Sequence, residues 1–130
     1  MEMVIDFPGG ARVDAHFEPY TVKTDQPPTG GGDGSAPAPF TLFLASIGTC
    51  AGIYVLGFCK QRNLPTDGIR IIQRAHPDPM TGMIGKIELE IQITRPTYDL
   101  LCQDFVCETH GSIQVKGKGE MDTWFLVGKR

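Results

Sequence analysis

Cys50 is the residue whose type and surroundings best fit a chemical role. It stands inside a long apolar stretch, between Gly48-Thr49 and Ala51-Gly52. These small neighbours leave room for a small substrate to approach the sulfur, and a thiolate is a strong nucleophile. A packing role stays open beside the reactive one, because free cysteines are among the most buried residue types.

A reactive thiol also needs a cation or a helix N-terminus close by. Basic residues of the predicted first strands are the candidates: Arg12, His16 and Lys23. Of these, we name Arg12 as the candidate activating residue. Cys59 is half a turn out of phase with Cys50 on a helix, so these two thiols cannot pair within it.

Two further groups of residues could bind ligands. Cys102, Cys107 and His110 form a C-x4-C-x2-H pattern, but zinc sites usually need four ligands and no fourth is evident. We therefore predict no metal site. Lys116 and Lys118, in a Lys-Gly-Lys-Gly run, could bind a phosphate, although a hairpin turn with solvated lysines explains them better.

The element that must position Cys50 is a helix predicted over residues 40–62. Residues 34–59 contain no charged side chain, and apolar residues cover almost every face. Such a helix is either a buried core helix or a membrane span. Its glycines and hydroxyl residues favour the buried alternative. Since a domain this small offers little cover, we expect a partner subunit to supply part of it.

The remaining elements are predicted to be short strands around this helix. Alternation and turn residues delimit them, and a Pro- and Gly-rich loop over 25–39 separates the first three from the helix. In residues 84–94 four apolar side chains alternate with polar ones, as in an antiparallel strand with one buried face. A short helix is expected over 97–103. The predicted strands are 3–5, 12–17, 20–23, 69–75, 84–94, 105–108, 111–116 and 121–127.

Length and composition limit the classes of protein. The 130 residues predict a single α+β domain over 1–130. A net charge of −3 without a basic patch disfavours nucleic acid and anionic membranes as partners. The N-terminus shows no signal peptide, and four cysteines are few for a disulfide scaffold, so we expect a reducing, cytoplasmic location.

Residues 9–93 resemble the OsmC/Ohr family of thiol-dependent peroxide-resistance proteins, in its OsmC-like branch. The stretch SAPAPFTLFLASIGTCAGIYVLGFC at 35–59, followed by IELEIQI, carries the resemblance. It implies an intertwined homodimer whose antiparallel sheets wrap long, buried central helices. It also implies that Cys50 attacks the peroxide and that a dithiol reduces the product, with no bound cofactor.

This sequence departs from the OsmC-like pattern at two places. Peroxidase members usually carry a Glu nine residues before the first cysteine, and here that residue is Thr41. No segment matches the second helix that bears the resolving cysteine. Cys107 stands at a plausible interval and is our candidate for that role.

Residues 91–130 resemble the C-terminal end of class III adenylate/guanylate cyclases, through TYDLL, the VKGKGEM run and TWFLVGKR. Residues 1–90 show none of the metal-binding aspartates or purine-selecting motifs that a cyclase needs, so we expect no cyclase activity. The two patterns meet at Ile91-Gln92-Ile93, which points to a chimera of an OsmC-like part, 1–90, and a helix–strand–strand tail, 91–130.

The sequence thus predicts an OsmC-like thiol peroxidase acting on a small peroxide. Two alternatives stay open. One is a non-enzymatic, fold-bearing chimera with an inert, buried thiol. The other is a weak phosphate or nucleotide binder that uses the lysine turn.

Overall fold

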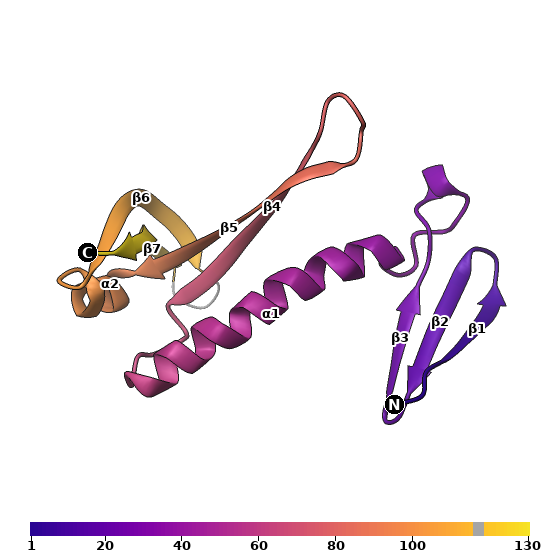
Figure 1. Ribbon diagram of the computed structural model, residues 1–130, viewed down its shortest axis with the longest axis horizontal. Helices are drawn as coiled ribbons and strands as arrows, with labels where there is room; N and C mark the ends of the chain where they lie inside the picture. Colours follow the sequence, from indigo (N-terminus) through magenta and orange to yellow (C-terminus); the bar gives the residue numbers. More distant parts are fainter. Residues whose placement is uncertain (116–118) are drawn as a thin grey trace. The chain divides into compact units, whose positions relative to one another are not determined.

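The structure is a computed structural model, and it describes residues 1–115 and 119–130. The chain divides into two compact units, residues 1–49 and 50–130. The expected α+β class is confirmed. The elements, in chain order (Figure 1), are β1 Val4–Gly9, β2 Arg12–Phe17, β3 Tyr20–Thr24, the short 3-10 helix η1 Pro28–Gly30, α1 Pro39–Gln61, β4 Ile69–Pro77, β5 Ile84–Thr94, α2 Arg95–Leu101, β6 Phe105–Val115 and β7 Gly119–Lys129.

The unit of residues 1–49 contains an antiparallel sheet in the order β1-β2-β3. Gly10, at φ +58°, forms the turn between β1 and β2, where a left-handed backbone favours glycine. The register places Asp6 opposite Asp14 and His16 opposite Thr21. Because side chains alternate along a strand, these four side chains share one face of the sheet.

The loop that follows β3 is organised by Asp25, whose side chain is 1% exposed. The carboxylate accepts hydrogen bonds from the Gln26 amide at 2.7 Å and from the Ser35 amide and hydroxyl at 3.0 and 2.7 Å. A Cβ added at Gly32 would collide with the Gln26 carbonyl. Glycine is therefore required where the loop folds back on itself.

Helix α1 agrees with the predicted helix to within one residue at each end. It ends where Asn63 takes a left-handed φ of +53° and the Leu64 amide donates to the Cys59 carbonyl at 2.9 Å. The expectation that this helix is covered on every side is not met within one chain, since Cys59 is its one buried residue. Phe58 and Cys59, near the C-terminal end of the helix, lie against the sheet of residues 50–130.

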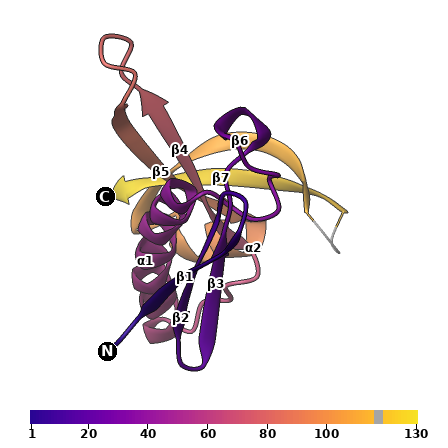
Figure 2. The same ribbon diagram turned by 90° about the vertical axis from the view of Figure 1, so that its right-hand side faces the viewer.

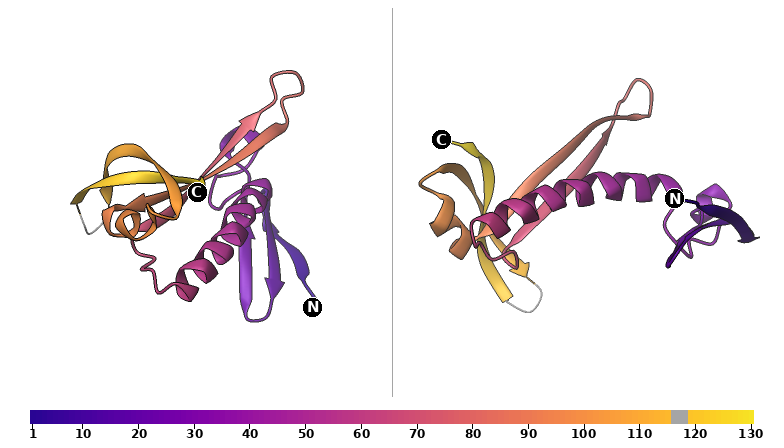
Figure 3. Two further views of the ribbon diagram at one scale, coloured as in Figure 1. Left: turned by 60° about the vertical axis from the view of Figure 1, so that its left-hand side comes forward. Right: turned by 60° about the horizontal axis from the view of Figure 1, so that its bottom comes forward.

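The unit of residues 50–130 contains a four-stranded antiparallel sheet in the order β4-β5-β7-β6. Figure 2 shows β6 and β7 side by side, and Figure 3 shows β4 and β5 continuing as a long hairpin. Ile93 pairs with Ile69 on one side and with Trp124 on the other. The C-terminal tail is therefore a part of the same sheet as β4 and β5.

The apolar core of this unit consists of Ile93, Leu101 and Trp124. Tyr98 stacks on Trp124 with ring centroids 4.5 Å apart. Phe58 of α1 meets Phe105 edge to face at 5.7 Å, which attaches the end of the helix to the sheet. Residues of the tail thus cover the core together with residues of the OsmC-like part.

Three local predictions need correction. The two strands expected over 105–108 and 111–116 form one strand, β6, because an irregularity between Thr109 and Gly111 keeps it paired with β7. The second helix begins earlier than predicted, at Arg95, since Pro96 fits its first turn. Gln92, expected on the solvent face of β5, is 1% exposed and accepts a hydrogen bond from Arg70.

Candidate active site on helix α1

Cys50 is exposed on α1. Tyr54, one turn later, is 81% exposed. Within the described residues, no hydrogen bond or ion pair reaches the Cys50 thiol. The Cys50 thiol is therefore accessible to a dissolved substrate. A cysteine that only fills space in the core would be buried.

The other three thiols are less accessible. Cys59 is 1% exposed, and burial raises the pKa of its thiol. Cys107, in β6, is half-buried against the core; burial raises the pKa of its thiol, and the nearby Cys102 adds to this while Arg130 opposes it. Since a raised pKa lowers the thiolate fraction at neutral pH, these two thiols are weaker nucleophiles than an accessible cysteine.

Arg12, the predicted activating cation, begins β2 in the unit of residues 1–49. Its Nε donates a hydrogen bond to the Gly9 carbonyl at 3.3 Å. This contact belongs to the β1–β2 turn, and an approach of Arg12 to Cys50 stays a prediction.

An apolar groove of about 240 Å³ lies between the C-terminal half of α1 and the sheet. Tyr54, Phe58 and Cys59 line its helix side. Ile69, Ile91, Ile93, Leu101, Phe105 and Leu126 are among the residues that line the other side. The groove begins one helical turn after Cys50, and it is suited to an apolar molecule.

The pattern of the OsmC-like protein family matches residues 32–110, more than half of the chain. This segment includes α1 with Cys50, β4, β5, α2 and part of β6. The chain belongs to the OsmC-like protein family. Membership supports a peroxiredoxin-type function and a role in stress response at the level of the family.

This OsmC-like chain is also similar to adenylate cyclases. One from Mycobacterium bovis and two from strains of Mycobacterium tuberculosis are each 46% identical to it over 88 residues. The match covers 65% of this chain but 18% of each cyclase. It is longer than residues 91–130, so part of the likeness lies within the OsmC-like segment. No solved structure matches the chain.

Both predicted resemblances are therefore confirmed. Cys107, the candidate resolving thiol of this OsmC-like chain, falls inside the matched segment, and its role stays a prediction. Lys116 and Lys118, the predicted phosphate-binding residues, lie outside the described residues. The neighbouring backbone pairs Val115 with Gly119 at the end of the β6–β7 ladder.

Helix α1 of this OsmC-like chain is long and apolar enough to cross a membrane, by length and composition alone. Only 6% of its most apolar stretch is buried. Its exposed large side chains are Phe40, Phe43, Ile53, Tyr54 and Leu56. A contiguous exposed apolar surface of this kind is typical of a site that another protein or a membrane covers.

Asp25 is an organising residue that the sequence patterns did not single out. Hydrogen bonds from the Ser35 hydroxyl and amide, more than those from Gln26 and Asp33, lower the pKa of Asp25 to about 2 against the opposing effect of burial. The available signal was an acidic residue directly before a Gly-rich loop, where free backbone amides gather. Asp25 thereby fixes the loop that leads into α1.

Proposed function

We propose that this chain reduces peroxides through Cys50, as a thiol-dependent peroxidase of the OsmC-like type. The observation that carries the proposal is the exposure of Cys50 on a helix whose other thiol, Cys59, is buried. Family membership over residues 32–110 supports the same chemistry.

The reaction is a nucleophilic displacement at oxygen. The Cys50 thiolate attacks one peroxide oxygen, the S–O bond forms as the O–O bond breaks, and the departing alkoxide takes up a proton to leave as an alcohol, or as water from hydrogen peroxide. The sulfur is oxidised to a sulfenic acid. A second thiol then displaces water to form a disulfide, and a dithiol reductant restores both thiols.

Two residues set the expected rate. Arg12 is our candidate for stabilising the thiolate and the departing oxygen. Thr41 occupies the position nine residues before Cys50 and cannot ionise, so no carboxylate from that position orients a cation. We therefore expect slower turnover than for a chain with a Glu there, and Thr41→Glu is the variant expected to raise it.

The substrate class follows from the apolar groove. Tyr54 lines this groove and follows Cys50 by one turn, so an apolar tail in the groove brings a peroxide group near the sulfur. We propose organic hydroperoxides in preference to hydrogen peroxide. Steady-state kinetics with cumene hydroperoxide and hydrogen peroxide compare the two, and Phe58→Ala is expected to raise KM for the organic peroxide alone.

We also propose that a second copy of the chain covers the exposed apolar side chains of α1 and leaves the Cys50 thiol open to substrate, in an intertwined homodimer. Five large apolar side chains of the helix are exposed. A reducing cytoplasm is the compartment that this proposal assumes, because it keeps the four thiols reduced.

The decisive experiment measures peroxide consumption with a dithiol reductant for the parent chain, Cys50→Ser and Cys102→Ser. Cys102 is a half-buried thiol outside the proposed reaction and serves as the matched control. We expect turnover in the parent and in Cys102→Ser and none above background in Cys50→Ser. Turnover that survives Cys50→Ser contradicts the proposal.

The resolving step is tested separately. If Cys107 resolves the sulfenic acid, Cys107→Ser leaves the first oxidation of Cys50 intact but slows its recovery, which sulfenic-acid trapping and mass spectrometry detect. Equal recovery in the parent and in Cys107→Ser assigns resolution to the external dithiol.

The proposed dimer is tested by sedimentation equilibrium of the parent chain and of Ile53→Glu. We expect a dimer for the parent and a monomer or unfolded chain for Ile53→Glu, with circular dichroism separating the last two. A folded parent monomer in detergent-free buffer contradicts the dimer. A parent that requires detergent for solubility points to a membrane as the cover.

A further inference from the structure

Asp6, Asp14 and His16 form a cluster of ligand atoms on the β1–β2 hairpin, which the proposed peroxidase chemistry does not use. One ligand atom from each of these residues lies within 4.8 Å of the other two. The register explains this convergence, because Asp6 faces Asp14 across the strands and His16 follows Asp14 on the same face. The cluster is internal to residues 1–49.

The two carboxylates of this cluster are incompletely neutralised. Like charges directly opposite each other destabilise an antiparallel pair. His16 Nε2 lies 2.9 Å from Asp6 Oδ2. Lys23 pairs in register with Asp14, yet within residues 1–115 and 119–130 no ion pair joins their side chains. A bound dication would relieve the remaining repulsion.

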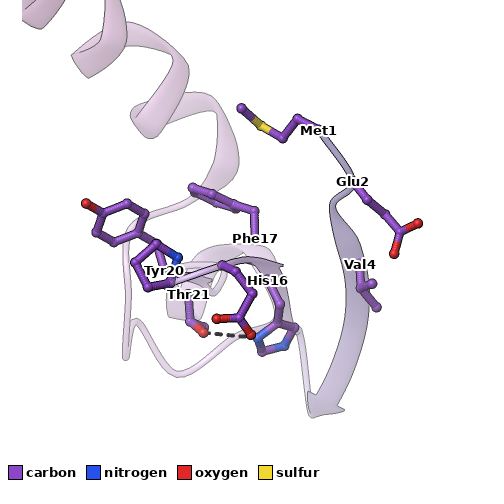
Figure 4. A pocket seen from close by; sticks show the side chains of 9 residues that line it. Met1, Glu2, Val4, His16, Phe17, Tyr20 and Thr21 are labelled. Atoms are coloured by element: carbon purple, nitrogen blue, oxygen red, sulfur yellow. Dashed lines mark hydrogen bonds between the residues drawn. The ribbon is translucent and has the colours of Figure 1, made fainter.

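A neighbouring residue orients the imidazole. His16 Nδ1 lies 3.0 Å from the Thr21 hydroxyl oxygen, the hydrogen bond drawn in Figure 4. Nε2–H donates to Asp6 Oδ2 at 2.9 Å in the metal-free chain. A metal ion that displaces this proton takes the Nε2 lone pair, and Nδ1–H then donates to the Thr21 oxygen. Outer hydrogen bonds of this kind are what metal-binding histidines use to fix their tautomer and ring orientation.

We propose that Asp6, Asp14 and His16 bind a divalent first-row transition metal ion, with Zn²⁺ as the representative. Imidazole and carboxylate donors suit such ions, whereas Ca²⁺ prefers six to eight oxygen ligands. Ligand atoms on a tetrahedral Zn²⁺ are about 3.3 Å apart, as bond lengths of roughly 2.0–2.1 Å require. The three ligand atoms, which lie within 4.8 Å of one another, must move by side-chain rotation to reach that spacing.

Three protein ligands leave a coordination position for water or another small molecule. His16 and Thr21 line an open hollow of about 760 Å³ together with Glu2, Val4 and Tyr20. Figure 4 shows these side chains around it. His16 is the ligand of the cluster that borders this hollow, and Glu2 and Glu18 give the hollow two acidic side chains.

The test is a Zn²⁺ titration of the reduced, full-length chain at neutral pH, followed by ¹H–¹⁵N NMR spectra. Zinc at this site shifts the amide signals of Asp6, Asp14 and His16, whereas zinc on the thiols shifts signals in residues 50–130. The two binding modes are therefore read separately, and the proposed peroxidase activity does not enter the measurement.

Asp14→Asn is the main variant. It removes one ligand, keeps the side-chain shape and relieves the charge repulsion, so the sheet is expected to stay folded. We expect at least about a tenfold loss of Zn²⁺ affinity for this variant, and a smaller loss for Thr21→Val, which frees the imidazole. Lys23→Ala is expected to raise the affinity modestly, because it removes a competing cation.

His76→Gln is the matched control. His76 Nε2 lies 2.9 Å from Glu88, as His16 does from Asp6, but Lys86 takes the place of the second acid. We expect parental Zn²⁺ affinity in this variant. Unchanged affinity in Asp14→Asn, or zinc-induced shifts confined to residues 50–130, overturns the proposed site.

Discussion

Different kinds of interaction stabilise the interiors of the two units of this chain. In residues 50–130, Ile93, Leu101 and Trp124 form an apolar core. In residues 1–49, the residues described as buried are polar, Thr24 and Asp25, and hydrogen bonds to Asp25 organise the loop. Residues 50–130 therefore derive stability from apolar burial, whereas residues 1–49 rely on local hydrogen bonding. Both units leave large apolar side chains exposed.

The largest expected difference between the units is in the free energy of unfolding lost when one aromatic side chain is removed from each. Trp124→Ala should cost about 3–5 kcal/mol of unfolding free energy, because it empties the core position stacked on Tyr98. Tyr20→Ala, at a position 64% exposed, should change it by at most about 0.5 kcal/mol. Urea unfolding measures both changes in free energy, and equal losses would contradict the stated difference between the two units.

The next effect concerns the two thiols of α1. Cys59 is buried and Cys50 is exposed. We expect native-state alkylation of Cys50 to be roughly a hundredfold or more faster than that of Cys59, which requires opening of the core. Mass spectrometry of time points measures the two rates, with Cys50→Ser as the control. Comparable alkylation rates would show that Cys59, near the end of α1, is as accessible to solvent as Cys50.

A smaller effect, on hydrogen exchange, is expected when the buried Asp25 carboxylate of residues 1–49 is changed. Asp25→Asn removes the negative charge that accepts hydrogen bonds from Ser35 and Asp33. Hydrogen exchange of these two amides should accelerate by roughly tenfold or more, while the amide of Ile93 keeps its protection. Equal acceleration at Ile93 would show that the two units open together.

The Asp25 carboxylate also predicts that the stability of its loop depends on pH. The pKa of Asp25 is lowered to about 2, against about 3.9 in an unfolded chain. The stabilisation is therefore complete above about pH 4 and is lost as the pH falls through about 2. Protection of the Ser35 amide should decline over this range in the parent chain but not in Asp25→Asn. A decline of the same size in both would assign it to other carboxylates.

The smallest effect is expected at the β4–β5 hairpin, away from the core. Contacts with Lys86 and then His76 lower the pKa of Glu88 to about 2. These groups are partly exposed, so salt screens them. Glu88→Gln should leave the urea midpoint nearly unchanged at physiological salt. A large shift would show that charge pairs, and not only the core, stabilise residues 50–130.

Local sequence patterns determined most of the secondary structure. The boundaries of β2 and β5 follow from strict alternation, and those of α1 from an apolar run between a Pro-rich loop and a polar end. Family membership could likewise be predicted, because residues 35–59 are specific in composition and order. Cys50 could be singled out for the same reason, and its chemical role stays a prediction.

Contacts between strands could not be predicted from the sequence and became visible in the folded chain. Gln92 alternates as a solvent-facing residue, yet Arg70 of the neighbouring strand helps to bury it. Asp6 joins Asp14 and His16 through the register of β1 on β2, which alternation alone does not fix. Sequence spacing encodes contacts within one helix or strand, whereas contacts between elements depend on pairing register and burial, and these are properties of the folded chain.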